Sequence, residues 1–272
     1  MGANGERANG ERANGASECV VIHTRRATSQ MSPARGARAP RARAPRACAT
    51  RDARRRTNRR DALRGVAAAI VATCARAERA NASVASEKIK RGAREFIRGD
   101  VRGAIDAFDD AIASDERFSA YMWQRGLALY YAGAYEEAAK QFRLDVAQNP
   151  NDTEESVWCF ASEAMDPEKG IAYARENMLI TGRDSRPVMS SVFALFAEGS
   201  EEAATRLREA GRSNASDEFY SALYLGLFYE INGDEERARR EIERANRTAY
   251  ARLSGDYMTD VARVHAKTRS WS

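Results

Sequence analysis

The amino-acid sequence predicts an all-α protein, a right-handed solenoid of about five helix-turn-helix units closed by a C-terminal capping helix. The first observation is an internal repeat, because like residues at a fixed spacing indicate stacked helical units. Four pairs of residues stand 34 positions apart: Gly92 and Gly126, Gly99 and Gly133, Ala104 and Ala138, and Phe108 and Phe142. The second observation is a late copy, in which Gly233-Asp234 matches Gly99-Asp100 and Ile242 takes the place of the phenylalanines.

A period of 34 residues is that of the tetratricopeptide repeat. The second unit fits this pattern best, and its signature residues are Gly126, Ala138, Phe142 and Pro150. Small residues let the two helices of a unit approach closely, an aromatic residue fills the groove between them, and proline cannot continue the second helix. The alternative interpretation is a set of five unrelated helical hairpins.

The repeat divides residues 83–272 into five units and a cap. The predicted units are 85–118, 119–152, 153–184, 185–218 and 219–252, followed by an amphipathic capping helix in 253–272. The third unit is two residues shorter than the others, and the fourth departs from the signature. Asp152 and Glu155 are spaced as a capping box at the start of the third unit, and Gly182 is expected to end its second helix.

Residues 1–56 are rich in Arg, Ala, Gly and Pro and contain few large apolar residues. Such a segment cannot bury enough surface to offset its chain entropy, so we expect a disordered leader. Eighteen arginines and six acids precede Ser83, whereas 26 basic and 33 acidic residues follow from there on. The Arg-rich leader is typical of an organelle transit peptide, and the alternative is a basic tail that binds nucleic acid or membrane. The acidic balance of the folded part argues against a nucleic-acid surface on it.

Residues 57–82 have the three parts of a signal peptide. Arg59 and Arg60 precede an uncharged run from Gly65 to Ala75, and Ala80-Asn81-Ala82 is a small-x-small cleavage site. The run is too short to span a bilayer, which needs about 20 apolar residues. The paired arginines predict a twin-arginine signal, removed after Ala82. A transit-like leader placed before such a signal resembles the two-part presequences of thylakoid lumen proteins, so we expect the chain in the thylakoid lumen of the chloroplast. The alternative is an amphipathic first helix of the solenoid.

The residues expected to be folded offer little catalytic chemistry. From Ser83 onward the chain has one histidine, His265, and one cysteine, Cys159, so no His/Cys metal cluster is expected. We predict no metal, no cofactor and no enzymatic activity. Cys159 is interpreted as a small buried apolar residue. Acids such as Glu154 and Glu155 stand at expected helix starts, where capping is their predicted role.

The concave face of the solenoid is the predicted binding surface. Its predicted partner-binding residues are Ile89, Phe96, Trp123, Leu127, Tyr130, Tyr131, Leu223 and Leu227. This apolar and aromatic face suits an amphipathic helix or extended peptide of a protein partner. The alternative is that the chain itself fills the groove, for example with its C-terminal helix. Co-chaperones built from tetratricopeptide repeats hold the C-terminal carboxylate of a chaperone with Lys, Arg and Asn on this face. Those residues are missing from the predicted face, so a co-chaperone role is disfavoured.

The segments WQRGLALYYAGAYEEAAKQFRLDVAQNPNDTEESVWCF, DSRPVMSSVFALF and FYSALYLGLFYE resemble the chloroplast lumen common family, a tetratricopeptide-like group of plants and green algae. The resemblance covers roughly residues 85–265. It implies a tetratricopeptide-like fold and a location in the thylakoid lumen, in agreement with the twin-arginine signal. It implies no functional residues.

These observations favour a non-enzymatic interaction scaffold of the thylakoid lumen. We expect it to assist assembly or maintenance of a photosynthetic complex and to associate peripherally with thylakoid membrane complexes. One alternative is a small-ligand or enzymatic role in an enclosed helical pocket that uses Trp123, Tyr130, Tyr131 and nearby carboxylates. A plastid RNA-binding helical repeat is the third hypothesis, and the acidic folded part disfavours it.

Overall fold

The computed structural model describes residues 79–271, and every regular element in this range is a helix, as predicted. The first helix runs through residues 79–98. It is followed by α2 (Val101–Ser114), the 3-10 helix η1 (Glu116–Tyr121), α3 (Trp123–Tyr131), α4 (Tyr135–Gln148), α5 (Thr153–Met165), α6 (Gly170–Glu176), α7 (Val188–Glu198), α8 (Glu201–Ala210), α9 (Ala215–Ile231), α10 (Glu235–Arg247), α11 (Ala249–Leu253) and α12 (Tyr257–Thr268).

The predicted leader 1–56 and the signal residues Arg59 and Arg60 lie outside the described residues. The predicted cleavage residues Ala80 and Ala82 lie in the first helix, on the same helix as the first repeat unit. Among residues 79–271, no helix is both long and apolar enough to cross a membrane.

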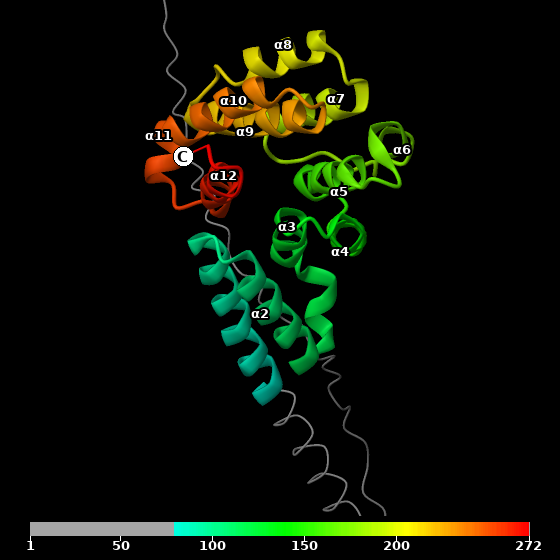
Figure 1. Ribbon diagram of the computed structural model, residues 1–272, viewed down its shortest axis with the longest axis vertical. Coiled ribbons are helices and arrows are strands. Elements are labelled where there is room, and N and C mark those ends of the chain that lie inside the picture. Colours follow the sequence, from blue (N-terminus) through cyan, green and yellow to red (C-terminus); the bar gives the residue numbers. More distant parts are fainter. Residues whose placement is uncertain (1–78, 272) are drawn as a thin grey trace, which may run out of the picture. The chain divides into compact units, whose positions relative to one another are not determined.

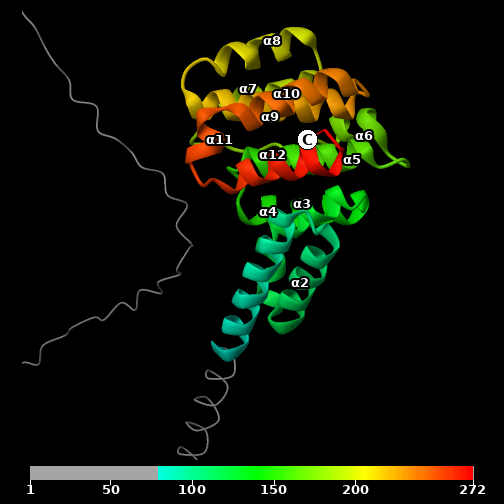
Figure 2. The same ribbon diagram turned by 60° about the vertical axis from the view of Figure 1, so that its left-hand side comes forward.

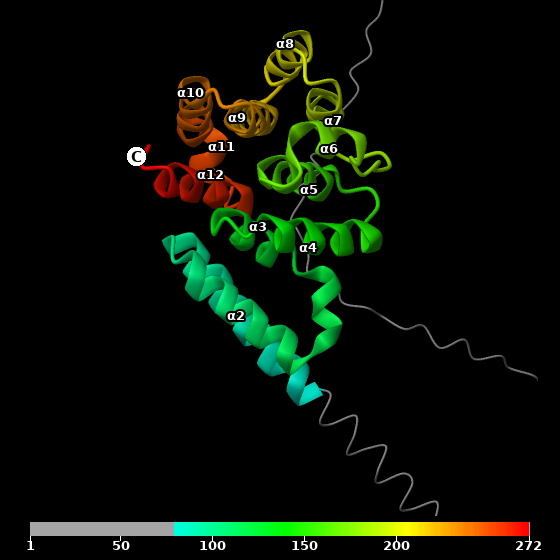
Figure 3. The same cartoon turned by 45° about the vertical axis from the view of Figure 1, so that its right-hand side comes forward.

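Helices pack mostly in the order of the chain (Figure 1), although α7 contacts α5 rather than α6, and α5 also contacts α9. The last described helix, α12, returns to α10 and lies between the α9–α11 end and α3 in two views (Figures 2 and 3). The chain therefore brings its last helix back to its second unit.

The two helices of a unit meet at the repeated glycines. A Cβ atom on Gly92 would lie 2.7 Å from the Phe108 ring, and one on Gly126 would lie 2.8 Å from the Phe142 ring. The late copy has the same contact, where a Cβ atom on Gly226 would lie 2.6 Å from Ile242. Glycine is required at these positions because a side chain would overlap the bulky residue sixteen positions later.

The turns inside three units share one backbone geometry. Gly99, Gly133 and Gly233 have φ of +83°, +78° and +75°, a region that favours glycine. In each turn, the glycine N–H donates to the carbonyl three residues earlier, and the next N–H donates to the carbonyl five residues earlier. These bonds form a Schellman motif that satisfies the last carbonyls of the first helix. Asp100 and Asp234 then cap the second helix through the N–H groups of Gly103 and Arg237.

The third unit differs from the others in its second half. Its helix α6 is short, and residues 178–184 have no regular structure. The predicted capping box is half formed. Asp152 accepts a hydrogen bond from the Glu154 N–H at 2.9 Å, but the N–H of Asp152 donates to Asn149 rather than to Glu155. Gly182 does not end a helix, because α6 already ends at Glu176, and its N–H donates to Pro150.

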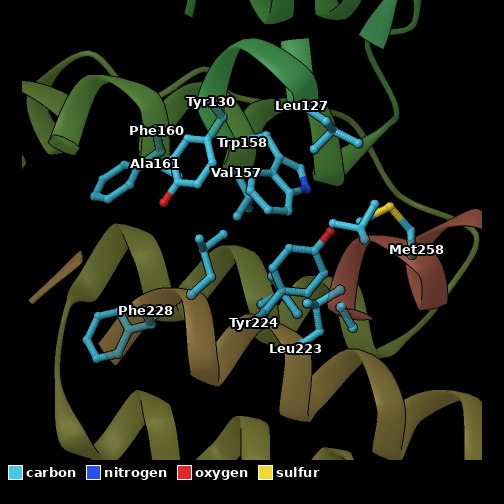
Figure 4. Close-up of a cluster of buried hydrophobic side chains, with 14 of the residues drawn as sticks. Leu127, Tyr130, Val157, Trp158, Phe160, Ala161, Leu223, Tyr224, Phe228 and Met258 are labelled. Carbon is cyan, nitrogen blue, oxygen red and sulfur yellow. The ribbon is translucent and has the colours of Figure 1, made fainter. Parts of the chain in front are cut away.

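The core is one continuous apolar cluster rich in aromatic side chains. In Figure 4, Tyr130 of α3 and Trp158 of α5 face Tyr224 and Phe228 of α9, with Met258 of α12 beside them. Side chains on almost every face of α9 are buried, so it is the central helix of the fold. The helices that pack against it are α5, α7, α8, α10 and α11.

Candidate functional site

The concave face predicted to bind a partner is covered by the chain itself. Phe96, Leu127, Tyr130, Tyr131, Leu223 and Leu227 are buried, whereas Ile89 and Trp123 are partly exposed. Six of the eight predicted residues are therefore buried against the chain itself, and their role in partner binding stays a prediction. The alternative, that the C-terminal helix fills the groove, describes the structure. The reason is tertiary, since the curvature of the helical stack brings α12 and α9 against α3 and the first helix.

Aromatic contacts hold α12 against the first two units. The ring of Tyr257 stacks on Phe96 with centroids 5.9 Å apart, and meets Trp123 edge-on at 5.1 Å. Further along α12, the imidazole of His265 meets the ring of Tyr131 edge-on at 5.6 Å. The predicted groove residues thus contact α12 in the way that a groove contacts a bound helix.

A buried polar network lies at the C-terminal half of α12. The carboxylate of Glu230 accepts hydrogen bonds from the Tyr130 hydroxyl at 3.1 Å and from Arg269 Nε. His265 Nε2 lies 3.5 Å from the same carboxylate, and His265 Nδ1 is 3.1 Å from the Tyr131 hydroxyl. The network joins α3, α9 and α12, which are far apart in the sequence.

Some groups of this network are charged near pH 7 and one is neutral. Burial lowers the pKa of His265 to about 4, so the imidazole is neutral near pH 7. Burial opposes ionisation of Glu230, yet its pKa lies below the ordinary value because His265 and Arg269 face the carboxylate. We assign the dominant effect to Arg269, since a neutral imidazole carries no charge. The Glu230–Arg269 ion pair is therefore the charged part of the network, and His265 is its neutral neighbour.

The N-terminus of α12 is held by a second set of hydrogen bonds. The hydroxyls of Tyr220 and Tyr250 each donate to Asp256 Oδ2 at 2.7 Å. The other oxygen of Asp256 caps α12 by accepting from the Met258 N–H at 2.9 Å. At the opposite end, Lys267 Nζ donates to the Arg98 carbonyl at 2.5 Å. Polar contacts thus fix α12 at both ends.

A second buried network surrounds Arg186. Its guanidinium binds Asp184 at 2.8 Å and Glu154 at 2.6 Å, and stacks over the Tyr220 ring at 5.1 Å. The hydroxyl of Tyr224 donates to Glu154 at 2.5 Å, and burial raises the pKa of Glu154 to about 7. Glu154 was predicted to act at a helix start. The structure also makes it an ion-pair partner between α5, α9 and the segment before α7.

Two buried carboxyl groups, Asp145 and Glu155, lie beside that network, and neither forms an ion pair within residues 79–271. Burial raises the pKa of Asp145 to about 7, with Gln141 Nε2 donating to its carboxylate at 3.3 Å. Burial, then the nearby Asp152, Asp145 and Glu154, raise the pKa of Glu155 to about 9. One buried carboxylate oxygen of Glu155 has no hydrogen-bond partner among the described residues. Sequence reasoning missed this burial, because a first-turn glutamate normally faces solvent.

The remaining predictions about chemistry concern Cys159 and metals. Cys159 is buried, and its thiol faces the Ala139 carbonyl at 3.7 Å, in agreement with its interpretation as an apolar core residue. Within residues 79–271, no group of His, Cys, Asp and Glu is placed to hold a metal ion.

The outer side of the C-terminal units has two adjoining hollows of about 430 and 560 Å³. Both are lined by Glu218 and Arg244, with further arginines from α8 and α10. Ion pairs such as Arg208–Glu241 and Arg247–Glu243 neutralise most of these charges. Trp123, Tyr130 and Tyr131, named for the small-ligand hypothesis, line neither hollow.

No protein-family model matches the chain, and no solved structure matches it significantly.

Proposed function

We propose that this protein is a non-enzymatic interaction scaffold with a tetratricopeptide-like solenoid that acts in the thylakoid lumen. The observation that supports it best is the recurrence of one helix-pair geometry in three units. Gly92, Gly126 and Gly226 each face a bulky residue sixteen positions later, and each of the three turns is a Schellman motif. Repeats of this kind serve chiefly to present extended surfaces to other proteins.

The proposed partner is a protein of a photosynthetic membrane complex or of its assembly intermediate. The support is the address predicted from Arg59-Arg60 and Ala80-Asn81-Ala82, together with the resemblance of residues 123–160 to the lumen family. No cofactor, metal or nucleic acid is part of the proposal. Association with the membrane would then be peripheral and would pass through the partner.

The compartment is tested by import of the full-length chain into isolated chloroplasts. We expect a protease-protected fragment beginning near Ser83 to accumulate in the lumen only while the proton gradient is intact. Replacement of Arg59 and Arg60 by lysine should block this step, whereas replacement of Arg55 and Arg56 by lysine should not. Equal accumulation of both variants, or accumulation in the stroma alone, would reject the address.

The scaffold role is tested in the same thylakoids by chemical crosslinking followed by purification of the imported protein. Recovery of a defined lumenal or thylakoid protein, repeated with independent crosslinkers, is expected. If the imported protein reaches the lumen and yields only crosslinks to itself, the scaffold proposal is wrong even though the address is right.

A further inference from the structure

We propose that the concave face beneath α12 is a helix-binding site, with α12 as its resident occupant and an amphipathic helix of the partner protein as its exchange ligand. The inference rests on the proposed scaffold function and names the surface and the kind of partner. It starts from the finding that Phe96, Trp123 and Tyr131, which were predicted to bind a helix, do contact one.

The aliphatic side chains of α12 are small, and its contacts with the aromatic face come from Tyr257 and His265. Apart from Met258, the buried aliphatic residues of α12 are Val261, Ala262, Val264 and Ala266. The free energy of burying an apolar side chain grows with its area, so leucine or phenylalanine in place of valine contributes more to the same contact. A partner helix with larger aliphatic residues at the places of Val261 and Val264 can therefore compete with α12, provided that the face adjusts to their volume.

The polar fit of α12 is incomplete. Within residues 79–271, the buried hydroxyl of Tyr257 and Nε2 of His265 on α12 have no hydrogen-bond partner. On the adjoining helix α10, Asn246 donates to the Ala262 carbonyl at 3.1 Å, but its own oxygen has no partner in the same range. Each unpaired buried polar atom weakens the docking of a helix. A ligand helix that avoids or satisfies these atoms would bind the face more tightly than α12 does.

A short linker joins α12 to the helix before it. Ser254, Gly255 and Asp256 connect it to α11, and Gly255 has φ of +70°. The polar anchors of α12 lie at Asp256 and Arg269, thirteen residues apart.

These anchors define the partner's chemistry. The ligand is a helix of about four turns with a carboxylate at its N-terminus, for the Tyr220 and Tyr250 hydroxyls, and an arginine at its C-terminus, for Glu230. Between them it carries leucine-sized residues at helical spacing on one face.

The test uses the full-length protein and a fluorescent peptide of residues 254–271 in which Val261 and Val264 are replaced by leucine. The variant Asp256→Ala removes the carboxylate by which α12 binds the Tyr220 and Tyr250 hydroxyls, and it leaves both hydroxyls for the aspartate of the peptide. The control Tyr121→Phe removes an exposed hydroxyl that faces Gln148. We expect saturable binding at least about tenfold tighter to Asp256→Ala than to the control, because α12 loses two hydrogen bonds that the peptide keeps.

Two results would overturn the proposal. The first is peptide binding that is absent or equal in the two variants, with both folded by circular dichroism. The second is measured on the wild type and tests the proposal even if Asp256→Ala fails to fold. Amides of α12 that exchange hydrogen no faster than those of α9 would show that α12 opens only with global unfolding. Peptide exchange without any lumenal crosslink would instead reject the scaffold role and leave the helix-binding site intact.

Discussion

The buried carboxyl group of Glu155 makes a sharp prediction about stability and pH. The folded chain holds this proton up to about pH 9, whereas the ordinary pKa of the group is 4.5. Between these values the unfolded chain binds fewer protons than the folded one, so the free energy of unfolding falls as pH rises. The group alone contributes a slope of about 1.4 kcal/mol per pH unit in this window.

The substitution Glu155→Gln removes the titration and keeps the shape of the side chain. Relative to the wild type, the variant should gain about 2.7 kcal/mol of unfolding free energy between about pH 5 and about pH 7. The α5 N-terminus favours a negative charge by up to about 1 kcal/mol, which lowers the pKa by less than one unit and leaves this window intact.

The measurement is urea unfolding followed by circular dichroism at several pH values. The control is Glu137→Gln, which replaces an exposed first-turn glutamate of α4 and should track the wild type. A constant difference between Glu155→Gln and the wild type across the pH range would show that the carboxyl group is hydrated in the folded state. The argument from burial would then fail.

Three further predictions follow from the packing. Gly126→Ala should lose about 1–3 kcal/mol in urea unfolding because its Cβ overlaps Phe142, whereas Gly133→Ala, with no atom within 4 Å but φ of +78°, should lose about 1 kcal/mol. Burial lowers the pKa of His265 from 6.5 to about 4, so between these pH values the unfolded chain binds more protons than the folded one. The free energy of unfolding should therefore fall as pH drops from 6.5 to about 4. The variant His265→Gln should show a smaller fall in the same urea unfolding assay. Burial raises the pKa of the Cys159 thiol to about 12, so peptide mass spectrometry should find it alkylated by iodoacetamide only after unfolding.

The buried charges show where sequence reasoning stopped. A glutamate in a first helical turn, such as Glu154 or Glu155, is usually a solvent-exposed contribution to the helix dipole. Here the irregular segment 178–184 and Tyr224 in the middle of α9 lie against that turn. Glu154 pairs with Arg186, whereas one oxygen of Glu155 has no hydrogen-bond partner among residues 79–271. The segment has no repeat period of its own, which is why its path was not predictable.

In the first, second and fifth predicted units, the sequence by itself determined the helix pair, its turn and the contact within it, because these depend on residues at most sixteen positions apart. A glycine facing Phe108 or Phe142, and a glycine with positive φ after the first helix, are local requirements that recur with the period. Only the tertiary structure decided that α12 lies on Trp123 and Tyr131 rather than beside them. The curvature of a stack of helix pairs is the sum of small rotations between neighbouring pairs. The short helix α6 and the irregular segment 178–184 change that sum in a way that no pairwise spacing in the sequence records.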